Sequence, residues 1–160
     1  MKKRVIMLLL AAIILAAPAL AFDVLAPTEL FYVADYAGVL ERDTIEHIVG
    51  KNDVLYNSTG AQICVVTVDF IGDAGIEDYA YKLFNDWGIG SAEKNNGVLL
   101  LLVIGAEDYY CMQGKGIEKN LSSGELGDIL YEYLEPDFAA KNYDDGVRKV
   151  FDALESKIST

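Results

Sequence analysis

The sequence predicts a three-layer α/β/α sandwich: a short, Rossmann-like mixed sheet with one parallel strand–helix–strand unit and a β-hairpin, covered by helices on both faces. Three observations support this fold class. Two segments, Ala61–Val68 and Gly97–Ile104, are apolar almost throughout, which is typical of strands buried on both faces. A helical pattern lies between them, so we expect the two strands to be parallel with a right-handed crossover. A short turn after the second strand predicts an antiparallel return.

The first half of the chain contains two helical patterns and one short strand. Residues 30–34 predict an edge strand, and a turn then leads into a helix from about Val39 to Tyr56. Asp73 follows a glycine and is the expected N-cap of the next helix. Apolar residues recur with the helical period in the first helix at Ile45, Ile48, Val49 and Leu55. In the second they recur at Ile76, Tyr79, Ala80, Leu83, Phe84 and Trp87.

The second half continues with a hairpin and then helices. Tyr109–Gln113 is the expected antiparallel strand. Ser122-Ser123-Gly124-Glu125 fits a capping box that opens a helix, and Pro136 is expected to break this helix. A last helix is predicted from about Tyr143 to Ile158. The sheet positions that we expect to be fully buried are Ile63, Val65, Val98, Leu100 and Leu102.

The N-terminus predicts export. Lys2, Lys3 and Arg4 precede an uncharged apolar run, and Ala19-Leu20-Ala21 supplies the small residues that a signal peptidase accepts. We therefore expect residues 1–21 to be a cleaved signal peptide and residues 22–160 to form one domain. The expected location is secreted or extracytoplasmic. In the alternative, residues 5–21 remain as a membrane anchor, although the apolar run is shorter than the roughly 20 residues that cross a bilayer.

The domain is strongly acidic. The full chain has 13 Lys and Arg and 25 Asp and Glu, and the signal segment holds three of the basic residues and none of the acidic ones. Residues 22–160 therefore carry 10 minus 25, or −15, charges. Such a charge repels nucleic acid and anionic headgroups, so we expect no nucleic-acid partner. Divalent cations and basic partners are favoured instead, unless the charge serves solubility alone.

The residue inventory removes several kinds of catalytic chemistry. The one histidine, His47, is expected on the solvent face of the first helix, which argues against a Ser-His-Asp triad and a histidine zinc site. Cys64 and Cys111 lie in apolar strand segments and are expected to be free, buried thiols. Gly114-Lys115-Gly116 lacks the Ser or Thr that follows the lysine of a nucleotide P-loop.

Carboxylates are the remaining candidates for a site. Asp69 follows a parallel strand, Asp73 precedes the next helix, and Asp35 precedes the first helix at the same edge of the sheet. Open α/β sheets bind ligands at the carboxyl ends of their strands. Carboxylates without imidazole or thiolate suit the hard cations Ca²⁺ or Mg²⁺. The alternative is that Asp35 and Asp73 cap helices and that Asp69 is a turn residue.

A second polar cluster is expected at the opposite edge of the sheet. Its members precede the second buried strand or follow the hairpin: Asp86, Asn95, Asn96, Gly114, Gly116 and Glu118. Trp87 lies beside them but is assigned to the core. In the structural alternative, Gly114 and Gly116 supply unusual backbone angles after the strand.

An ordered set of short motifs resembles the TPM domain family, whose members include thylakoid lumen proteins and many bacterial exported proteins. The motifs are Asp35-Tyr36-Ala37-Gly38-Val39-Leu40, Thr59-Gly60-Ala61-Gln62, Ile76-Glu77-Asp78-Tyr79-Ala80, Trp87-Gly88-Ile89-Gly90, Asn95-Asn96-Gly97-Val98-Leu99-Leu100 and Gly114-Lys115-Gly116-Ile117-Glu118 with Leu121. Their order and spacing hold from about Phe31 to Ile158.

The resemblance implies an α/β/α sandwich, binding of calcium or a similar cation, and in some relatives a weak acid phosphatase activity. Relatives often carry Asp where Ser123 stands and an acidic residue at Asn95, so the second cluster is less negative here. The expected function is a domain that binds Ca²⁺ or Mg²⁺, with weak phosphomonoester hydrolysis as an added activity. The alternative is a non-catalytic interaction module that acts on envelope or membrane proteins.

Overall fold

A computed structural model of the chain describes residues 22–159, so the predicted signal peptide lies outside the described residues. The strands are β1 (Val33–Asp35), β2 (Gln62–Val68), β3 (Gly97–Val103) and β4 (Asp108–Gln113). The α-helices are α1 (Arg42–Thr59), α2 (Ile76–Trp87), α3 (Ser123–Ile129), α4 (Glu135–Ala139) and α5 (Tyr143–Ile158). Shorter helical turns are η1 (Ile104–Ala106), η2 (Lys115–Ile117) and η3 (Leu130–Leu134). Within residues 22–159, no helix has the length and apolar character needed to span a membrane.

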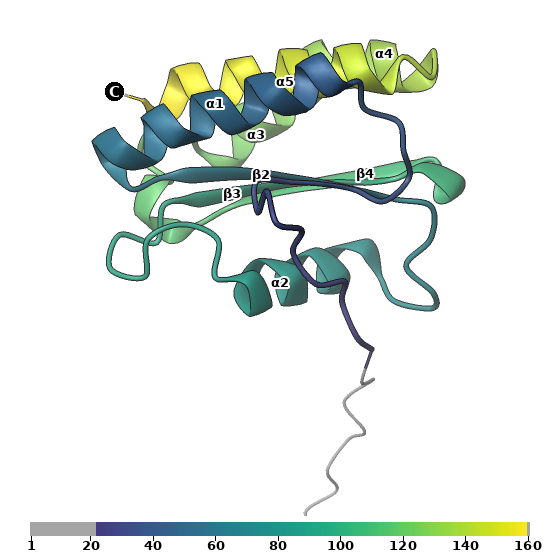
Figure 1. Cartoon of the computed structure of the whole chain (residues 1–160), viewed down its shortest axis with the longest axis horizontal. Helices are drawn as coiled ribbons and strands as arrows, with labels where there is room; N and C mark the ends of the chain where they lie inside the picture. Colours follow the sequence, from purple (N-terminus) through teal and green to yellow (C-terminus); the bar gives the residue numbers. More distant parts are fainter. Residues whose placement is uncertain (1–21, 160) are drawn as a thin grey trace, which may run out of the picture.

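The four strands form a mixed sheet in the order β1-β2-β3-β4 (Figure 1). β1, β2 and β3 are parallel, and β4 returns antiparallel beside β3. α2 connects the two central parallel strands across one face of the sheet, while α1, α3, α4 and α5 cover the other face. The predicted α/β/α sandwich, its parallel unit and its hairpin are therefore confirmed.

Each face of the sheet has its own apolar core, because successive side chains of a strand point to opposite faces. Val65 and Leu100 belong to the core under α1 and the C-terminal helices, whereas Val66 and Leu101 belong to the core against α2. Every residue of β3 is buried. The predicted core positions are all 0% exposed: Ile63, Val65, Val98, Leu100 and Leu102.

The boundaries of the first elements differ from the sequence-based expectation. β1 comprises residues 33–35 rather than 30–34, and α1 both begins and ends three residues later than predicted. The start of α1 depends on Asp144 in α5, whose carboxylate accepts hydrogen bonds from the Glu41 N–H (2.7 Å) and the Thr44 hydroxyl (2.9 Å). A partner so distant in sequence leaves no local signal, which is why the start was misplaced. Gly60 ends the helix with a left-handed backbone, φ 76°.

Two predicted helix signals were wrong. Asp73 is not the N-cap of α2; that position belongs to Gly75, which has no side-chain cap. Pro136 does not end the helical path after α3, because the π-helical turn η3 leads directly into α4 with the proline in its first turn. The proline directly follows this wider turn, in which the Glu135 N–H bonds to the Leu130 carbonyl five residues earlier. The capping box at Ser122 and Glu125 is confirmed.

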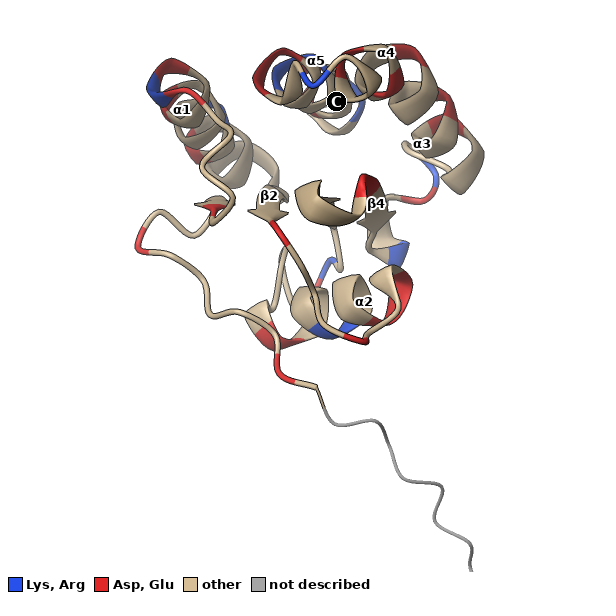
Figure 2. Ribbon diagram, turned by 90° about the vertical axis from the view of Figure 1, so that its right-hand side faces the viewer, with Lys and Arg blue, Asp and Glu red and all other residues tan. Residues whose placement is uncertain are grey.

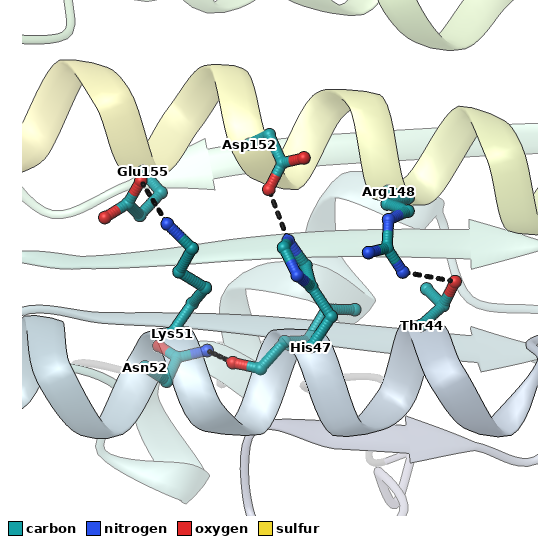
Figure 3. Close-up of polar contacts among 8 residues, drawn as sticks. Thr44, His47, Lys51, Asn52, Arg148, Asp152 and Glu155 are labelled. Atoms are coloured by element: carbon teal, nitrogen blue, oxygen red, sulfur yellow. Dashed lines mark hydrogen bonds and ion pairs between the residues drawn. The ribbon is translucent and has the colours of Figure 1, made fainter.

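α1 and α5 contact each other through a seam of polar side chains (Figure 3). The seam comprises Thr44, His47 and Lys51 of α1 with Arg148, Asp152 and Glu155 of α5. His47 Nε2 lies 2.5 Å from Asp152 Oδ1, and its side chain is only 21% exposed. The prediction that His47 faces solvent was therefore wrong, because the helix turns this side chain towards α5.

Candidate functional site

Asp35 ends β1 and organises the turn that leads into α1. Its Oδ1 accepts a hydrogen bond from the Val39 N–H and its Oδ2 one from the Leu40 N–H, both at 3.0 Å. The Thr67 hydroxyl also donates to Asp35 Oδ1, at 2.5 Å. Both carboxylate oxygens therefore hold the backbone of the turn, although the N-cap position itself belongs to Glu41.

The partner of Asp35 in this turn was missed from the sequence. Thr67 is 0% exposed within an apolar strand, and it pairs in register with Asp35 across β1 and β2. Its carbonyl accepts hydrogen bonds from the N–H groups of Tyr36 and Ala37, at 2.9 and 3.2 Å. A polar residue in an otherwise apolar strand was the available signal, since a buried hydroxyl needs a partner.

Asp69 lies just beyond the end of β2 at the same edge of the sheet. Its side chain is exposed and has no hydrogen bond or ion pair with another described residue. Its carbonyl accepts a hydrogen bond from the Gly105 N–H at 2.9 Å. A Cβ at Gly105 would stand 2.6 Å from that carbonyl oxygen and 2.4 Å from the Phe70 ring, so this close approach requires glycine. The turn after β3 thus holds the backbone of Asp69 and leaves its carboxylate free.

Asp73 is exposed in the turn before α2. Within residues 22–159, no three His, Cys, Asp or Glu side chains form a group that could hold a metal ion. Asp35, Asp69 and Asp73 are therefore not a preassembled three-carboxylate centre. The pairing of β1 with β2 does bring Asp35 and Asp69 to one edge, and cation binding there stays a prediction.

The second predicted cluster forms a compact turn in front of β3. Asn96 is 5% exposed, and its amide accepts a hydrogen bond from Ser91 N–H (2.9 Å) and donates one to the Thr59 carbonyl (3.3 Å). Lys94 Nζ donates to the same carbonyl at 2.6 Å. Together these contacts fasten the C-terminus of α1 to the turn. The Asn96 amide is thus committed to structural hydrogen bonds.

Gly114 and Gly116 are needed for close packing rather than for unusual backbone angles. A Cβ at Gly114 would stand 2.2 Å from the Asn95 carbonyl oxygen, and one at Gly116 would stand 1.6 Å from the Lys94 carbonyl oxygen. Neither glycine has a positive φ; it is Asn95 that has a left-handed backbone, with φ 50°. The expectation of unusual angles at the two glycines was therefore wrong. Glycine is required at both positions because residues 114 and 116 lie directly against the backbone of residues 94–95.

The remaining members of this cluster do not gather around a ligand. Asp86 forms an ion pair with Lys82 of its own helix at 2.7 Å. Glu118 is exposed after η2. Trp87 is buried in the core, as predicted, and its Nε1–H donates to the Leu25 carbonyl at 2.8 Å, which attaches the N-terminal lead-in to α2.

The two thiols and the histidine are not members of either candidate site. Cys64 and Cys111 are free and buried, as predicted, and they lie in different cores. Burial raises the pKa of both thiols well above its usual value, so neither forms the thiolate that a nucleophile requires. His47 lies between α1 and α5. Cysteine and histidine therefore provide no catalytic pair at either site.

The fold and the arrangement of these turns define a class: a three-layer α/β/α domain whose short motifs fix the connections at both ends of the sheet. The family model of the TPM domain matches residues 33–157. The chain therefore belongs to the TPM domain family. The motif residues Asp35, Gly114 and Gly116 are seen to position backbone in this chain. No curated protein matches the chain.

Solved structures support the same fold. The N-terminal domain of a protein from P. gingivalis is 35% identical, with a TM-score of 0.71 over 79% of this chain and 80% of that one. The N-terminal domain of the cg2496 protein from Corynebacterium glutamicum is 17% identical, with a TM-score of 0.61 over 87% and 90%. The BA42 protein from Bizionia argentinensis is 18% identical, with a TM-score of 0.62 over 75% and 81%. The last two show a shared fold alone.

Proposed function

We propose that this TPM domain binds a divalent cation, Ca²⁺ or Mg²⁺, at the carboxyl edge of the sheet. We use this term for Asp35 and Asp69, with Asp73 in the following turn. One observation carries the proposal: β1 and β2 pair in parallel, so that Asp35 stands beside Thr67 and Asp69 follows only two residues later. The side chain of Asp69 is exposed and unpaired among the described residues. The −15 charge of residues 22–160 favours a cation as well.

The donor chemistry of this edge fits a hard cation. Ca²⁺ takes six to eight oxygen ligands, which include backbone carbonyls and water as well as carboxylates. Asp69 would be the principal carboxylate, because Asp35 already accepts three hydrogen bonds. The opposite cluster is less suitable, since Asp86 is paired with Lys82 and Asn96 is held by internal hydrogen bonds.

Calorimetric and thermal titration with CaCl₂ and MgCl₂ tests the proposal. Asp69→Asn is the informative variant, because Asp35→Asn would also disturb the turn. The matched control is Asp53→Asn, which changes an exposed carboxylate on α1. Calcium at about 100 times its Kd should stabilise the domain by about 2.7 kcal/mol. Asp69→Asn should lose most of this gain and Asp53→Asn should keep it. A melting temperature that neither cation changes, or an equal loss of cation-induced stabilisation in both variants, contradicts the proposal.

Weak phosphatase activity is proposed only as a consequence of the cation. A bound metal ion can polarise a phosphoryl oxygen and activate water, which would replace the nucleophile that the two buried cysteines cannot supply. Turnover of p-nitrophenyl phosphate should therefore disappear with a chelator and with Asp69→Asn. Turnover that persists in both conditions would contradict this mechanism.

A non-catalytic interaction module, acting on envelope or membrane proteins, is the second candidate function. It is favoured by the absence, at the carboxyl edge, of a cysteine or histidine that could act in catalysis. In that function the cation would stabilise the domain while another surface contacts the partner. Cation binding without turnover would support this alternative over the phosphatase.

A further inference from the structure

β4 is an edge of the sheet, because within residues 22–159 it pairs with β3 alone. The Gly114 N–H donates to the Gly97 carbonyl at 2.8 Å, and this pair sets the alternation of the antiparallel ladder. It follows that the backbone groups of Cys111 and Gln113 point away from β3. Neither backbone has a hydrogen-bond partner among the described residues. The backbone N–H and carbonyl groups of these two residues are therefore available to pair with another strand.

The same edge borders an apolar groove. The groove has a volume of about 270 Å³ and lies between β4 and α3. Leu126 and Leu130 line it from the helical side, and Cys111 and Gln113 line it from the strand. An added strand would thus place alternate side chains in this groove while its backbone pairs with β4, since strand side chains alternate between faces.

Gly127 keeps this groove open. It lies in the interior of α3, where glycine weakens a helix relative to other residues. A Cβ at Gly127 would meet no atom within 4 Å, and the residue has no positive φ. By contrast, Gly114 and Gly116 are required by close backbone contacts. Packing within the described chain gives no reason for glycine at position 127, and it gives none at the exposed Gly50 of α1 either. Gly127, however, lines the groove beside β4, where a bound ligand would supply a reason.

The face of β4 that is turned towards α2 lies near negative charge. Tyr110 and Met112 pack against the core under α2, on the other face of β4 from Cys111, and both also border the groove. Burial, together with the nearby carboxylate of Glu77 in the first turn of α2, raises the pKa of Tyr110. Asp and Glu positions also occur on the helices of both layers (Figure 2). Basic side chains on the α2-facing side of an added strand would therefore complement this negative charge.

We propose that the β4 edge and the groove of α3 bind an extended peptide segment of another protein, which adds to the sheet as a fifth strand. Its side chains alternate: apolar residues enter the groove beside Gly127, and basic residues face Glu77 and α2. Backbone hydrogen bonds to Cys111 and Gln113 supply affinity, and the groove supplies selectivity, as in other cases of strand addition. The inference assigns a binding surface to the interaction module proposed above as the second candidate function, and it does not depend on cation binding.

The probe is a synthetic peptide, acetyl-Thr-Val-Lys-Val-Lys-Val-Thr-amide, titrated into the isotope-labelled protein and followed by amide NMR shifts and hydrogen exchange. The Cys111 and Gln113 amides should shift and become protected, whereas Met112, already paired with β3, should change little. A peptide with proline at the central valine position, and one with glutamate for lysine, should each bind at least about tenfold more weakly.

Gly127→Leu separates binding from folding. The new side chain fills the groove and should weaken peptide binding at least about tenfold, while a better helix former raises the melting temperature. Gly50→Leu is the matched control, because Gly50 is an exposed glycine within α1 whose Cβ would also meet nothing within 4 Å. It should raise the melting temperature and leave peptide affinity unchanged.

Several results would overturn the inference. Wild-type affinity in Gly127→Leu, equal binding of all three peptides, or unchanged Cys111 and Gln113 amides would each do so. A dimer that forms without peptide and is abolished by Gly127→Leu would show that a second copy occupies the edge instead. Because Asp69→Asn leaves this edge intact, failure of cation binding and failure of peptide binding are distinguished in the same set of variants.

Discussion

Replacing Asn52 should be among the most destabilising single changes in this domain. Asn52 lies on α1 and is 0% exposed. Its Nδ2 donates to the carbonyls of Ile48 (3.0 Å) and Ile63 (2.9 Å), and its Oδ1 accepts from the Ile63 N–H (2.8 Å). β1 pairs with β2 from Val65 to Thr67 and does not reach Ile63. The amide of Asn52 therefore replaces the strand that is missing beside Ile63.

The magnitude follows from the groups that would lose their partners. Asn52→Leu keeps a similar volume but leaves the N–H and the carbonyl of Ile63 buried and unpaired. Each such group costs about 1–3 kcal/mol. We therefore expect a loss of about 4 kcal/mol in the free energy of unfolding, a large part of the roughly 5–15 kcal/mol of a typical domain.

Denaturant unfolding of purified protein, followed by circular dichroism, measures this loss. Asn57→Leu is the matched control, because Asn57 is an exposed asparagine of the same helix. Its stability should change by no more than about 0.5 kcal/mol. A loss below about 1 kcal/mol in Asn52→Leu, or equal losses in the two variants, would refute the assigned role of the Asn52 amide.

Two further predictions concern the core and the start of α3. Leu100→Ala in β3 should cost about 2–5 kcal/mol in the same unfolding assay, as deletion of a buried leucine does, and a loss below about 1 kcal/mol would contradict the central position of this strand. The Ser122 N–H and then Lys157 lower the pKa of Glu125 to about 2 from its usual 4.5, so its stabilising effect is complete above about pH 4.5 and is lost as pH falls towards 2. Glu125→Gln should therefore lower the melting temperature at pH 6 and have little effect near pH 2; a difference independent of pH would contradict this.

The parts of the fold that were predictable are those with strong local patterns. β2 and β3 are uninterrupted apolar segments, and α2 and α5 repeat apolar residues at the helical period. For α5 both predicted boundaries are correct, and the capping box of α3 was visible in four consecutive residues. In each case, the residues that determine the element lie within it.

The missed features depend on partners that are distant in sequence. The N-terminus of α1 is held by Asp144, and the position beside Ile63 is filled by Asn52 of another element. His47 was assigned to solvent because the stripe of α1 was taken from its apolar residues, whereas Thr44 and Asn52 are equally buried on it. Polar residues that are satisfied by tertiary contacts belong to the core, and hydrophobic periodicity does not find them.

For the candidate site, the sequence placed Asp35 and Asp69 correctly at the carboxyl ends of adjacent strands but did not show what each side chain contacts, and cation binding stays a prediction. Parallel pairing of β1 and β2 put Asp35 and Asp69 at the carboxyl ends of adjacent strands, which follows from topology. Only the geometry shows that Asp35 is bonded to the turn while Asp69 is not. This difference makes Asp69, rather than Asp35, the residue whose replacement tests cation binding.

The glycines show why residue type alone does not indicate function. Gly114 and Gly116 belong to a family motif, yet each is explained by a backbone contact that any Cβ would block. Gly127 belongs to no motif quoted above, weakens its helix, and has empty space where a side chain would stand. A residue that the fold requires says little about ligands, because stability alone accounts for it. A glycine that the fold would be more stable without is better evidence for a binding surface where, like Gly127 and unlike the exposed Gly50, it lines a groove beside an edge strand. For this reason the β4 edge is tested separately from the carboxyl edge.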